Sequence, residues 1–459
     1  MRFLRYRLSI LFALLLFFTA FVPAGYASPL DEVRDLLEKY YVDKLDEDVL
    51  QEDSVSEMLE HLDPYTAYFT KDEMKMFIQS IEQSYAGIGI MVDQKEDKIE
   101  VTNVFPDSPA SKVGVLTGDT ILGVNGKSVE GNKIEEVTKM IKGEAGTSVL
   151  LTLKHSGARQ PYVVEIMRKE VKLPSVTTEQ LGGNIGYMKV SVFNDQTVTE
   201  MKKALKYMND VEKWIVDLRN NPGGYVSAAQ RMTGLFPDVE KTLVMENRFG
   251  SYTFPAFTQT TQFKGETALL VNNQSASASE IVAGAVKDGE AATIYGEKTF
   301  GKGLMQKIYE LSDGSALKMT TSRFYTPKYN QINDVGVEPD VATETPLEDA
   351  HFQMLLENHK NYQEMAELTE VVPDKKFEIR FTQPIDITTF NPDTVQLIEL
   401  GGKEIEYKSE MTDNRTLSIK PEKPLEVGNE YVLFVHPNWK TSNHKLASKG
   451  IYVQVKVKA

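Results

Sequence analysis

The chain has 459 residues, of which 41% are hydrophobic and 25% are charged, and its formal net charge is −15. This composition is typical of globular protein, and the length predicts two or three domains because single cores rarely outgrow a few hundred residues. The acidic balance makes a nucleic-acid partner unexpected, and the absence of cysteine excludes disulfides, thiolate metal sites and a cysteine nucleophile.

The first residues have the pattern of a secretory signal peptide. Arginines precede an apolar stretch over residues 8–22, which breaks at Pro23 and reaches small residues up to Ala27. The stretch is shorter than the roughly 20 residues that span a bilayer, so an uncleaved membrane anchor is the less favoured alternative. We therefore expect residues 1–27 to be a signal peptide and the protein to be extracytoplasmic, either secreted or associated with the cell envelope.

Residues 28–82 follow a helical pattern. Apolar side chains recur at steps of three and four residues in two stretches: Leu30, Val33, Leu36, Leu37 and Tyr40, and then Met74, Phe77, Ile78 and Ile81. Two short amphipathic helices cannot bury a core by themselves. They must pack on the following domain or on a second copy, so docking within one chain and a homodimer through these helices are both open.

Residues 83–168 combine short strands with one amphipathic helix. Alternating apolar residues predict strands over 99–104 and 149–153, and helical spacing predicts a helix around 134–141. Turn motifs lie before and between these elements: Gly87-Ile88-Gly89-Ile90, Ser108-Pro109-Ala110 and Gly118-Asp119-Thr120-Ile121-Leu122-Gly123-Val124-Asn125-Gly126. Together they resemble a PDZ domain.

This resemblance implies a site for a peptide's terminal carboxylate. The backbone N–H groups of the loop would bind the carboxylate while the peptide adds as a strand to the sheet edge; the loop residues are Gly87, Ile88, Gly89 and Ile90. Glycines suit that task because backbone donors can converge without obstruction by Cβ atoms. The basic residue that assists in this family corresponds to Lys142, and lysine lacks the bidentate fork of arginine.

Residues 169–366 alternate between strand and helix patterns. Strands are predicted over 185–193, 214–218, 268–271 and 293–295, and helices over 199–208, 227–235 and 277–286. This alternation indicates an α/β core.

From residue 372 to residue 459 the apolar period changes to two, with breaks at proline and glycine. The pattern predicts a small β-sandwich and resembles bacterial Ig-like domains. The fold class is thus α+β multidomain: an N-terminal helical segment, a PDZ domain, an α/β core and a C-terminal β-sandwich.

Three segments of the α/β core carry candidate chemistry. The first is Gln274-Ser275-Ala276-Ser277-Ala278-Ser279-Glu280, where a buried strand gives way to a helix. Ser277 lies at the expected helix N-terminus, where unpaired N–H groups favour a developing negative oxygen. The spacing Ser277-x-x-Glu280 also fits a capping box, so plain helix capping is the alternative.

The second segment is Phe300-Gly301-Lys302-Gly303-Leu304-Met305-Gln306. It nearly matches a phosphate-binding P-loop, but a glycine replaces the required Ser/Thr and a strand follows instead of a helix. In an extended segment Lys302, Leu304 and Gln306 share one face, so a lysine and an amide can point together into a pocket. A solvated lysine on a sheet face is the alternative.

The third segment, Asn220-Asn221-Pro222-Gly223-Gly224, follows the strand over 214–218. Its glycines can expose backbone N–H donors at the carboxyl edge of the sheet, as an oxyanion hole requires. A tight connection between a strand and a helix is the alternative.

The three segments together resemble the C-terminal processing peptidases, a Ser-Lys serine protease family, over roughly residues 30 to 350. Leu62-Asp63-Pro64-Tyr65 and Gly336-Val337-Glu338-Pro339-Asp340 belong to the same resemblance. It implies that Ser277 is the nucleophile, Lys302 the general base and Gln306 the residue that holds the lysine. It also implies that the backbone N–H groups of Gly223 and Ala278 stabilise the oxyanion.

A lysine base needs a pKa lowered from about 10.4 toward neutrality, which desolvation in an apolar pocket can achieve. Phe300, Leu304 and Met305 are available to line such a pocket, and no histidine lies in either motif.

We therefore expect an exported serine endopeptidase that recognises protein C-termini through its PDZ domain and requires no cofactor or metal. Its expected partners are proteins or peptides with free C-termini. A non-catalytic peptide-binding scaffold at the cell envelope is the alternative, and the intact Ser277, Lys302 and Gln306 argue against it.

Overall fold

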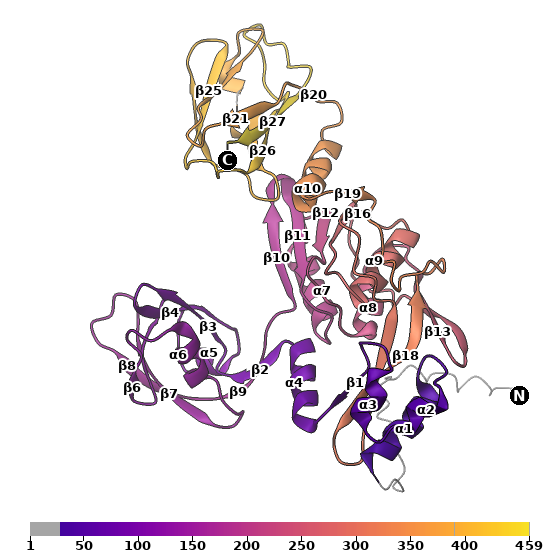
Figure 1. The fold of residues 1–459 in the computed structure, drawn as a ribbon. Helices are drawn as coiled ribbons and strands as arrows, with labels where there is room; N and C mark the ends of the chain where they lie inside the picture. Colours follow the sequence, from indigo (N-terminus) through magenta and orange to yellow (C-terminus); the bar gives the residue numbers. More distant parts are fainter. Residues whose placement is uncertain (1–27, 390, 459) are drawn as a thin grey trace, which may run out of the picture.

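The computed structural model describes residues 28–389 and 391–458, and Figure 1 shows their arrangement. The signal peptide expected at residues 1–27 lies outside this range. No helix in the described part of the chain is both long and apolar enough to cross a membrane.

The N-terminal segment packs on the core of its own chain. It contains α1 (Pro29–Tyr40), α2 (Glu47–Leu50), α3 (Val55–Glu60), β1 (Ala67–Phe69) and α4 (Lys71–Ile81). The apolar side of α1, including Val33 and Leu37, is buried with Tyr309, Leu317 and Met319. Strand β1 pairs with β18 (Ala316–Tyr325). Docking within one chain therefore accounts for the stripe of α1, and a homodimer stays a prediction.

The PDZ unit has a sheet of order β3-β4-β5-β7-β8, with β6 paired to β5. Its elements are β3 (Ile90–Lys95), β4 (Lys98–Val104), α5 (Pro109–Lys112), β5 (Thr120–Val124), β6 (Lys127–Ser128), α6 (Ile134–Ile141), β7 (Ser148–Lys154) and β8 (Tyr162–Met167). The alternation of β7 directs Val149, Leu151 and Leu153 into a core that α6 covers with Val137. The strands and the helix predicted here are confirmed.

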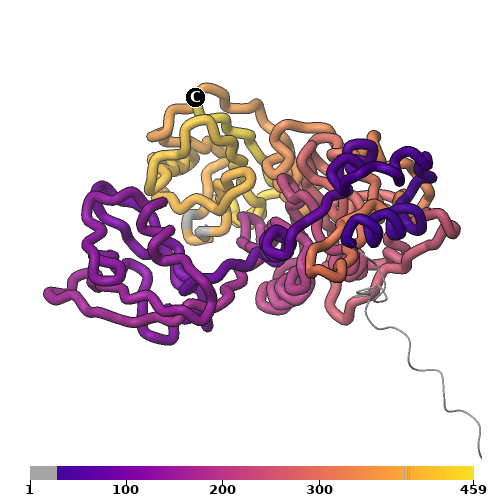
Figure 2. Tube along the Cα trace, turned by 60° about the horizontal axis from the view of Figure 1, so that its bottom comes forward, coloured from indigo at the N-terminus to yellow at the C-terminus, as the bar shows by residue number. Residues whose placement is uncertain are grey.

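A two-stranded ladder joins the PDZ unit to the rest of the chain. It consists of β2 (Ser84–Gly87) and β9 (Lys169–Lys172), which are antiparallel. Figures 1 and 2 show the PDZ unit to one side of the α/β core, beyond this ladder and α4.

The α/β core is built on a sheet of order β10-β11-β12-β15-β16-β19. Its strands are β10 (Val176–Leu181), β11 (Ile185–Val190), β12 (Lys213–Asp217), β15 (Thr267–Val271), β16 (Thr293–Gly296) and β19 (Val341–Ala342). All neighbours are parallel except β10 on β11. The predicted alternation of strand and helix is confirmed.

Helices cover both faces of this sheet. Side chains such as Trp214 and Val216 face a cluster with α7 (Thr197–Tyr207), α8 (Val226–Thr233) and α9 (Ala278–Asp288). The intervening Ile215 and Leu270 face a second cluster with α10 (Pro346–Glu357) and the C-terminal domain. Because strand side chains alternate, one buried strand serves both layers.

A second sheet of the core joins the N-terminal segment to the strand that follows Lys302. Its order is β1-β18-β13-β14, and β17 also pairs with β18. The remaining strands are β13 (Lys241–Asn247), β14 (Gly250–Pro255) and β17 (Leu304–Glu310). Lys302 therefore lies just before β17 and not within it, although the predicted strand itself is present.

The C-terminal domain has two sheets around one apolar cluster. The first contains β20 (Gln363–Glu364), β21 (Leu368–Val371), β23 (Val395–Glu399), β26 (Glu430–Val435) and β27 (Ile451–Val457), and the second contains β22 (Phe377–Arg380), β24 (Tyr407–Met411) and β25 (Thr416–Pro421). Two short 3-10 helices of this domain are η2 (Ile387–Thr389) and η3 (Pro392–Thr394). A further one, η1 (Gly182–Asn184), lies between β10 and β11 of the core. The resemblance to Ig-like domains stays a prediction.

Buried His351 of α10 fastens the C-terminal domain to the core. Its Nε2 donates to the carbonyl oxygen of Gly182, and its Nδ1 accepts from the N–H of Gly401, both at 2.9 Å.

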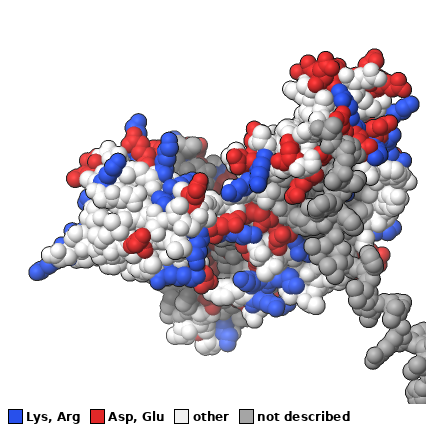
Figure 3. All heavy atoms as spheres, turned by 90° about the horizontal axis from the view of Figure 1, so that it is seen from below, with Lys and Arg blue, Asp and Glu red and all other residues white. Residues whose placement is uncertain are grey.

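On the face that Figure 3 shows, basic and acidic side chains are interspersed.

Candidate active site

Ser277 occupies the N-cap position of α9 in a backbone conformation that an ordinary cap does not adopt. Cap residues usually have extended backbones, whereas Ser277 has φ 56° and ψ −110°. Such a positive φ is strained for a residue with a side chain, and strain of this kind persists where the surrounding structure enforces it, often at active sites. The geometry thus favours the nucleophile hypothesis over simple capping.

The serines on either side of Ser277 have structural partners instead. Both are fully buried: the Ser275 hydroxyl donates to the carbonyl oxygen of Leu218 at 2.8 Å, and the Ser279 hydroxyl donates to that of Asn221 at 2.9 Å. These bonds fix the Ser277 turn to the loop that follows β12. Of the three serines, Ser277 is the one whose side chain is partly exposed.

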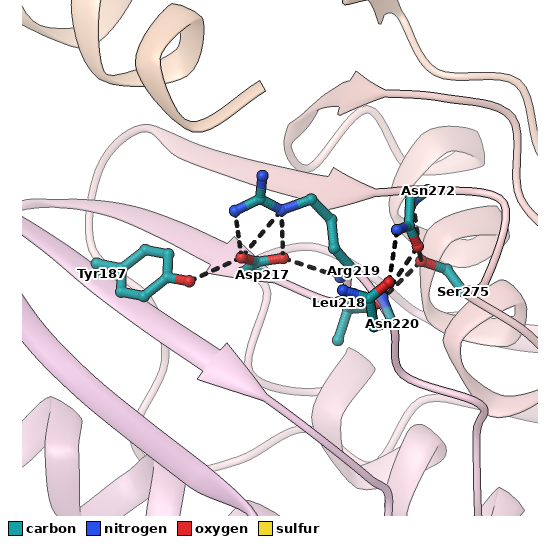
Figure 4. A network of polar contacts seen from close by, with 7 residues as sticks. All are labelled: Tyr187, Asp217, Leu218, Arg219, Asn220, Asn272 and Ser275. Atoms are coloured by element: carbon teal, nitrogen blue, oxygen red, sulfur yellow. Dashed lines mark hydrogen bonds and ion pairs between the residues drawn. The ribbon is translucent and has the colours of Figure 1, made fainter. Parts of the chain in front are cut away.

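The carboxyl ends of β12 and β15 are held together by a polar network (Figure 4). Buried Asp217 accepts from the Tyr187 hydroxyl at 2.7 Å and from the Arg219 guanidinium at 2.7 Å. The Asn272 side chain accepts from the N–H of Asn220 at 3.0 Å and donates to its side-chain oxygen at 2.9 Å. The network sets the path of the loop that carries Gly223.

One buried carboxylate links the backbones of the proposed nucleophile and base. Glu280 Oε2 accepts from the N–H of Ser277 at 2.9 Å and from the N–H of Lys302 at 2.8 Å. Oε1 accepts from the N–H of Gly301 at 2.6 Å and from the Thr299 hydroxyl at 2.7 Å. Burial raises the pKa of Glu280, and these four hydrogen bonds oppose that rise. Glu280, the acidic residue of the capping-box pattern, therefore also connects the Ser277 turn to the segment that carries Lys302.

The Lys302 side chain lies in a mostly desolvated place. Its Nζ is 4.5 Å from the centroid of the Tyr65 ring. Burial, assisted by the positive charge of Lys318, lowers the pKa of Lys302 to about 8, although Asp63 and Glu280 act in the opposite direction. Lys302 is thus not the solvated surface lysine of the alternative interpretation, and its lowered pKa makes the neutral form easier to reach than in an ordinary lysine.

The residues that enclose Lys302 differ in part from those expected. Phe300 is 56% exposed and does not wall off the lysine. Instead Tyr65 comes from the N-terminal segment, because β1 places that segment against β18. Lys318, on β18, has its own pKa lowered by burial, and its Nζ lies 4.8 Å from the Phe77 ring centroid.

Gln306 lies near the start of β17, and its amide Nε2 donates to the Thr320 hydroxyl at 3.1 Å. Among the described residues, no hydrogen bond joins Gln306 to Lys302 or the Ser277 hydroxyl to the Lys302 Nζ. Catalytic hydrogen bonds are often long without substrate. The structure therefore brings the backbones of the base and nucleophile together and leaves their side-chain roles as predictions.

Gly223 packs directly against the Ser277 turn. A Cβ on Gly223 would lie 2.9 Å from the Ser277 Cβ and 3.0 Å from the backbone nitrogen of Ala278, and φ here is +109°. Only glycine fits this approach. However, the Gly223 N–H already donates to Asn221 Oδ1 at 2.9 Å, so it binds an oxyanion only if that side chain gives way.

Four of the five predicted peptide-binding residues of the PDZ unit meet at one cavity. Gly87, Ile88, Ile90 and Lys142 line a hollow of about 550 Å³ between β3 and α6. Gly89 has a φ of +81°, which turns the loop. The Lys142 Nζ lies 5.6 Å from the centroid of the Tyr85 ring, within the same cavity.

Comparison with known proteins agrees with this geometry. Residues 184–343 match the model of peptidase family S41, and residues 100–154 match a PDZ domain model. Residues 184–343 therefore belong to peptidase family S41.

Relatives from Staphylococcus species match a longer part of the chain. A probable CtpA-like serine protease of Staphylococcus aureus is 36% identical over 324 residues, which are 69% of this chain and 64% of the relative. One from Staphylococcus epidermidis is 36% identical over 325 residues, 69% of this chain and 65% of the relative. The chain thus spans less than two thirds of these relatives. A solved photosystem II D1 C-terminal processing protease is 25% identical, with coverage of 72% of this chain and 95% of that chain and a TM-score of 0.45.

Sequence reasoning missed the contributions of Tyr65, Asp63 and Lys318. The only sequence signal was the Leu62-Asp63-Pro64-Tyr65 run, which supported the family resemblance without a role. Their roles depend on the pairing of β1 with β18, and that pairing joins positions about 250 residues apart.

Proposed function

We propose that the protein is an exported serine endopeptidase in which Ser277 is the nucleophile and Lys302 the general base. The observation that carries the proposal is the shared Glu280 oxygen, which accepts from the N–H groups of both residues at 2.9 and 2.8 Å. The strained backbone of Ser277 and the lowered pKa of Lys302 support the same assignment.

The chemistry requires Lys302 in its neutral form. Its Nζ takes the proton of the Ser277 hydroxyl as Oγ attacks the carbonyl carbon of the scissile peptide bond. The oxyanion is stabilised by the N–H of Ala278, at the positive end of α9, and by the N–H of Gly223 once Asn221 releases it. The lysine ammonium then protonates the departing amine, and the same lysine activates the water that hydrolyses the acyl-enzyme.

The PDZ cavity would supply substrate selection. A carboxylate bound at the Gly87–Ile90 loop, near Lys142, holds the C-terminal end of a substrate protein on the enzyme. Cleavage then becomes effectively intramolecular, which raises the rate without any new contact at the scissile bond. The substrate class is therefore proteins with accessible, flexible C-terminal tails.

Cleavage by variants tests the catalytic assignment. Ser277→Ala is expected to abolish cleavage of an unstructured substrate with an apolar C-terminus and to keep the circular dichroism spectrum of the wild type. A fluorophosphonate probe should label the wild type and fail to label Ser277→Ala. Proteolysis by the purified variant at the wild-type rate would refute the assignment, and an inactive wild type that still binds C-terminal peptides would favour a scaffold.

Peptide titration tests the PDZ role. An amidated peptide should bind at least roughly tenfold more weakly than the same peptide with a free carboxylate, because a buried carboxylate forms strong hydrogen bonds to N–H groups. Lys142→Ala should reduce this preference, with exposed Lys139→Ala as the control. Equal affinities for the acid and the amide would rule out carboxylate recognition.

A further inference from the structure

A chain of hydrogen bonds runs from the N-terminal segment to Gln306. The Gln306 Nε2 donates to the Thr320 Oγ1 at 3.1 Å, and the Thr320 hydroxyl donates to Asp63 Oδ1 at 2.9 Å. Gln306 and Thr320 are register partners on β17 and β18. Thr320 is fully buried, so its hydroxyl has no water to replace either partner.

The direction of these bonds follows from chemistry. A carboxylate only accepts hydrogen bonds, so the single hydroxyl proton of Thr320 must point to Asp63. The Thr320 oxygen then faces Gln306 as an acceptor, which selects the NH₂ group of the amide. The Gln306 Oε1 is left over, and no hydrogen bond to it is recorded among the described residues. A carbonyl oxygen is the end of an amide that an ammonium group can bind.

Asp63 is itself held in place by the turn that contains Tyr65. Its Oδ1 accepts from the N–H of Tyr65 at 2.9 Å, and its Oδ2 accepts from the Thr66 hydroxyl at 2.7 Å and from the Tyr41 hydroxyl at 3.1 Å. The ring of Tyr65 meanwhile lies under the Lys302 Nζ. One N-terminal turn therefore contacts the lysine directly and the glutamine through Thr320.

We propose that Asp63 and Thr320 are positioning residues, which fix the Gln306 amide so that its carbonyl oxygen is presented to Lys302. The role rests on the proposed Ser-Lys function. It makes the N-terminal segment part of the catalytic apparatus, in addition to its packing on β18.

Substitution of Thr320 tests the proposal. Thr320→Val keeps the shape and removes the hydroxyl, so the amide can turn its NH₂ group toward the lysine. We expect kcat to fall on the order of tenfold with KM unchanged, because only orientation at the reacting groups is lost. The pH at which kcat is half-maximal should move lower, because an NH₂ group that faces Lys302 disfavours its ammonium form and so lowers its pKa. The charged groups around Lys302 are Lys318, Asp63 and Glu280, and the substitution alters none of them.

Two variants serve as controls. Thr320→Ser keeps the hydroxyl and should restore kcat and the pH profile. Thr321→Val removes a hydroxyl one position along β18 for which no hydrogen bond is recorded in the described chain, and it should behave as the wild type. If Thr320→Val is unfolded by circular dichroism, Thr320→Cys replaces it with the same expectation, because a thiol is a weak donor.

A double-mutant cycle decides whether Thr320 acts through Gln306. In a Gln306→Ala background, Thr320→Val should cause no further loss of kcat. An equal loss in both backgrounds, or wild-type kcat and pH profile in Thr320→Val, would overturn the positioning role. Lys302→Ala is measured in parallel: if it is inactive, failure of the Thr320 prediction leaves the proposed function intact. If it cleaves as the wild type does, the proposed function and the positioning role both fall.

Discussion

The turn that carries Ser277 and the segment that carries Lys302 are fixed in different ways. The turn at Ser277 is held within the α/β core, where Ser275 and Ser279 bond to the loop after β12. The backbone of Lys302 shares Glu280 with that turn, but its side chain rests on Tyr65 of the N-terminal segment. Ser277, the proposed nucleophile, is thus positioned by its own neighbourhood, whereas Lys302, the proposed base, depends on a distant segment for its environment. Variants should therefore separate the reactivity of the serine from the proton affinity of the lysine.

The largest effect is expected for Lys302→Arg. Arginine stays protonated at every working pH and cannot accept the serine proton. Cleavage should fall by roughly a thousandfold or more, as in Lys302→Ala, because the triad members of serine proteases act as a unit. Steady-state cleavage from neutral to alkaline pH measures this. In the wild type the rate should rise through a pKa of about 8 and level off above it, because deprotonation produces the active base. Wild-type turnover by the arginine variant would mean that Lys302 contributes only charge.

The second-largest effect is expected for Glu280→Gln, because Glu280 binds the backbones of both Ser277 and Lys302. The two carboxylate oxygens of Glu280 accept four hydrogen bonds, and glutamine would keep only one oxygen for these donors. Its NH₂ group would face N–H groups, to which it cannot bond. We expect a loss of kcat of about a hundredfold and a lower unfolding temperature, since a buried charged acceptor is lost. The control is Glu297→Gln, because Glu297 is exposed and lies in the loop that also carries Lys302. Kinetics and thermal unfolding in parallel test the prediction, and an unchanged kcat would show that the shared carboxylate does not set the catalytic geometry.

Ser275→Ala and Ser279→Ala should affect stability more than chemistry. Each change removes a hydroxyl that donates to a buried carbonyl oxygen, and that oxygen keeps one backbone N–H donor, so the expected cost is about 1 kcal/mol. Denaturant unfolding should reveal that loss, while kcat in the remaining folded enzyme should fall less than about tenfold. Complete inactivation of a well-folded Ser279→Ala protein would contradict the assignment of the nucleophile to Ser277 alone.

Tyr65→Leu should have the smallest effect, and it should change only the pKa of Lys302. The ring stabilises the ammonium by a cation–π interaction of about 0.5–1 kcal/mol, so its removal should lower the pKa of Lys302 by roughly half a unit. The pH at which the rate is half-maximal should move down accordingly, while fluorophosphonate labelling of Ser277 at high pH should stay the same. A shift toward higher pH would show that Tyr65 mainly excludes water from the lysine.

Several of these features could be predicted from sequence because they depend on near neighbours. Alternating strand and helix patterns located β12, β15 and α9, and the small-residue run at the start of α9 indicated Ser277. The sequence left capping and the nucleophile role of Ser277 both open, and the backbone angles that bear on this choice are not specified by a sequence. Similarly, the stripe of α1 predicted a packing surface, but whether it met β18 or a second chain was open.

The sequence by itself determined the order of the elements and the turn before α9, which follow from periodicity and turn chemistry within a few residues. The family of the core came from the resemblance of three short motifs to the C-terminal processing peptidases. The tertiary structure decided the surroundings of Lys302. Desolvation of Lys302 and the orientation of the Gln306 amide depend on which side chains meet in space, and Asp63 and Thr320 are 257 positions apart. No local pattern can encode a contact between such distant residues, because it forms only when β1 pairs with β18.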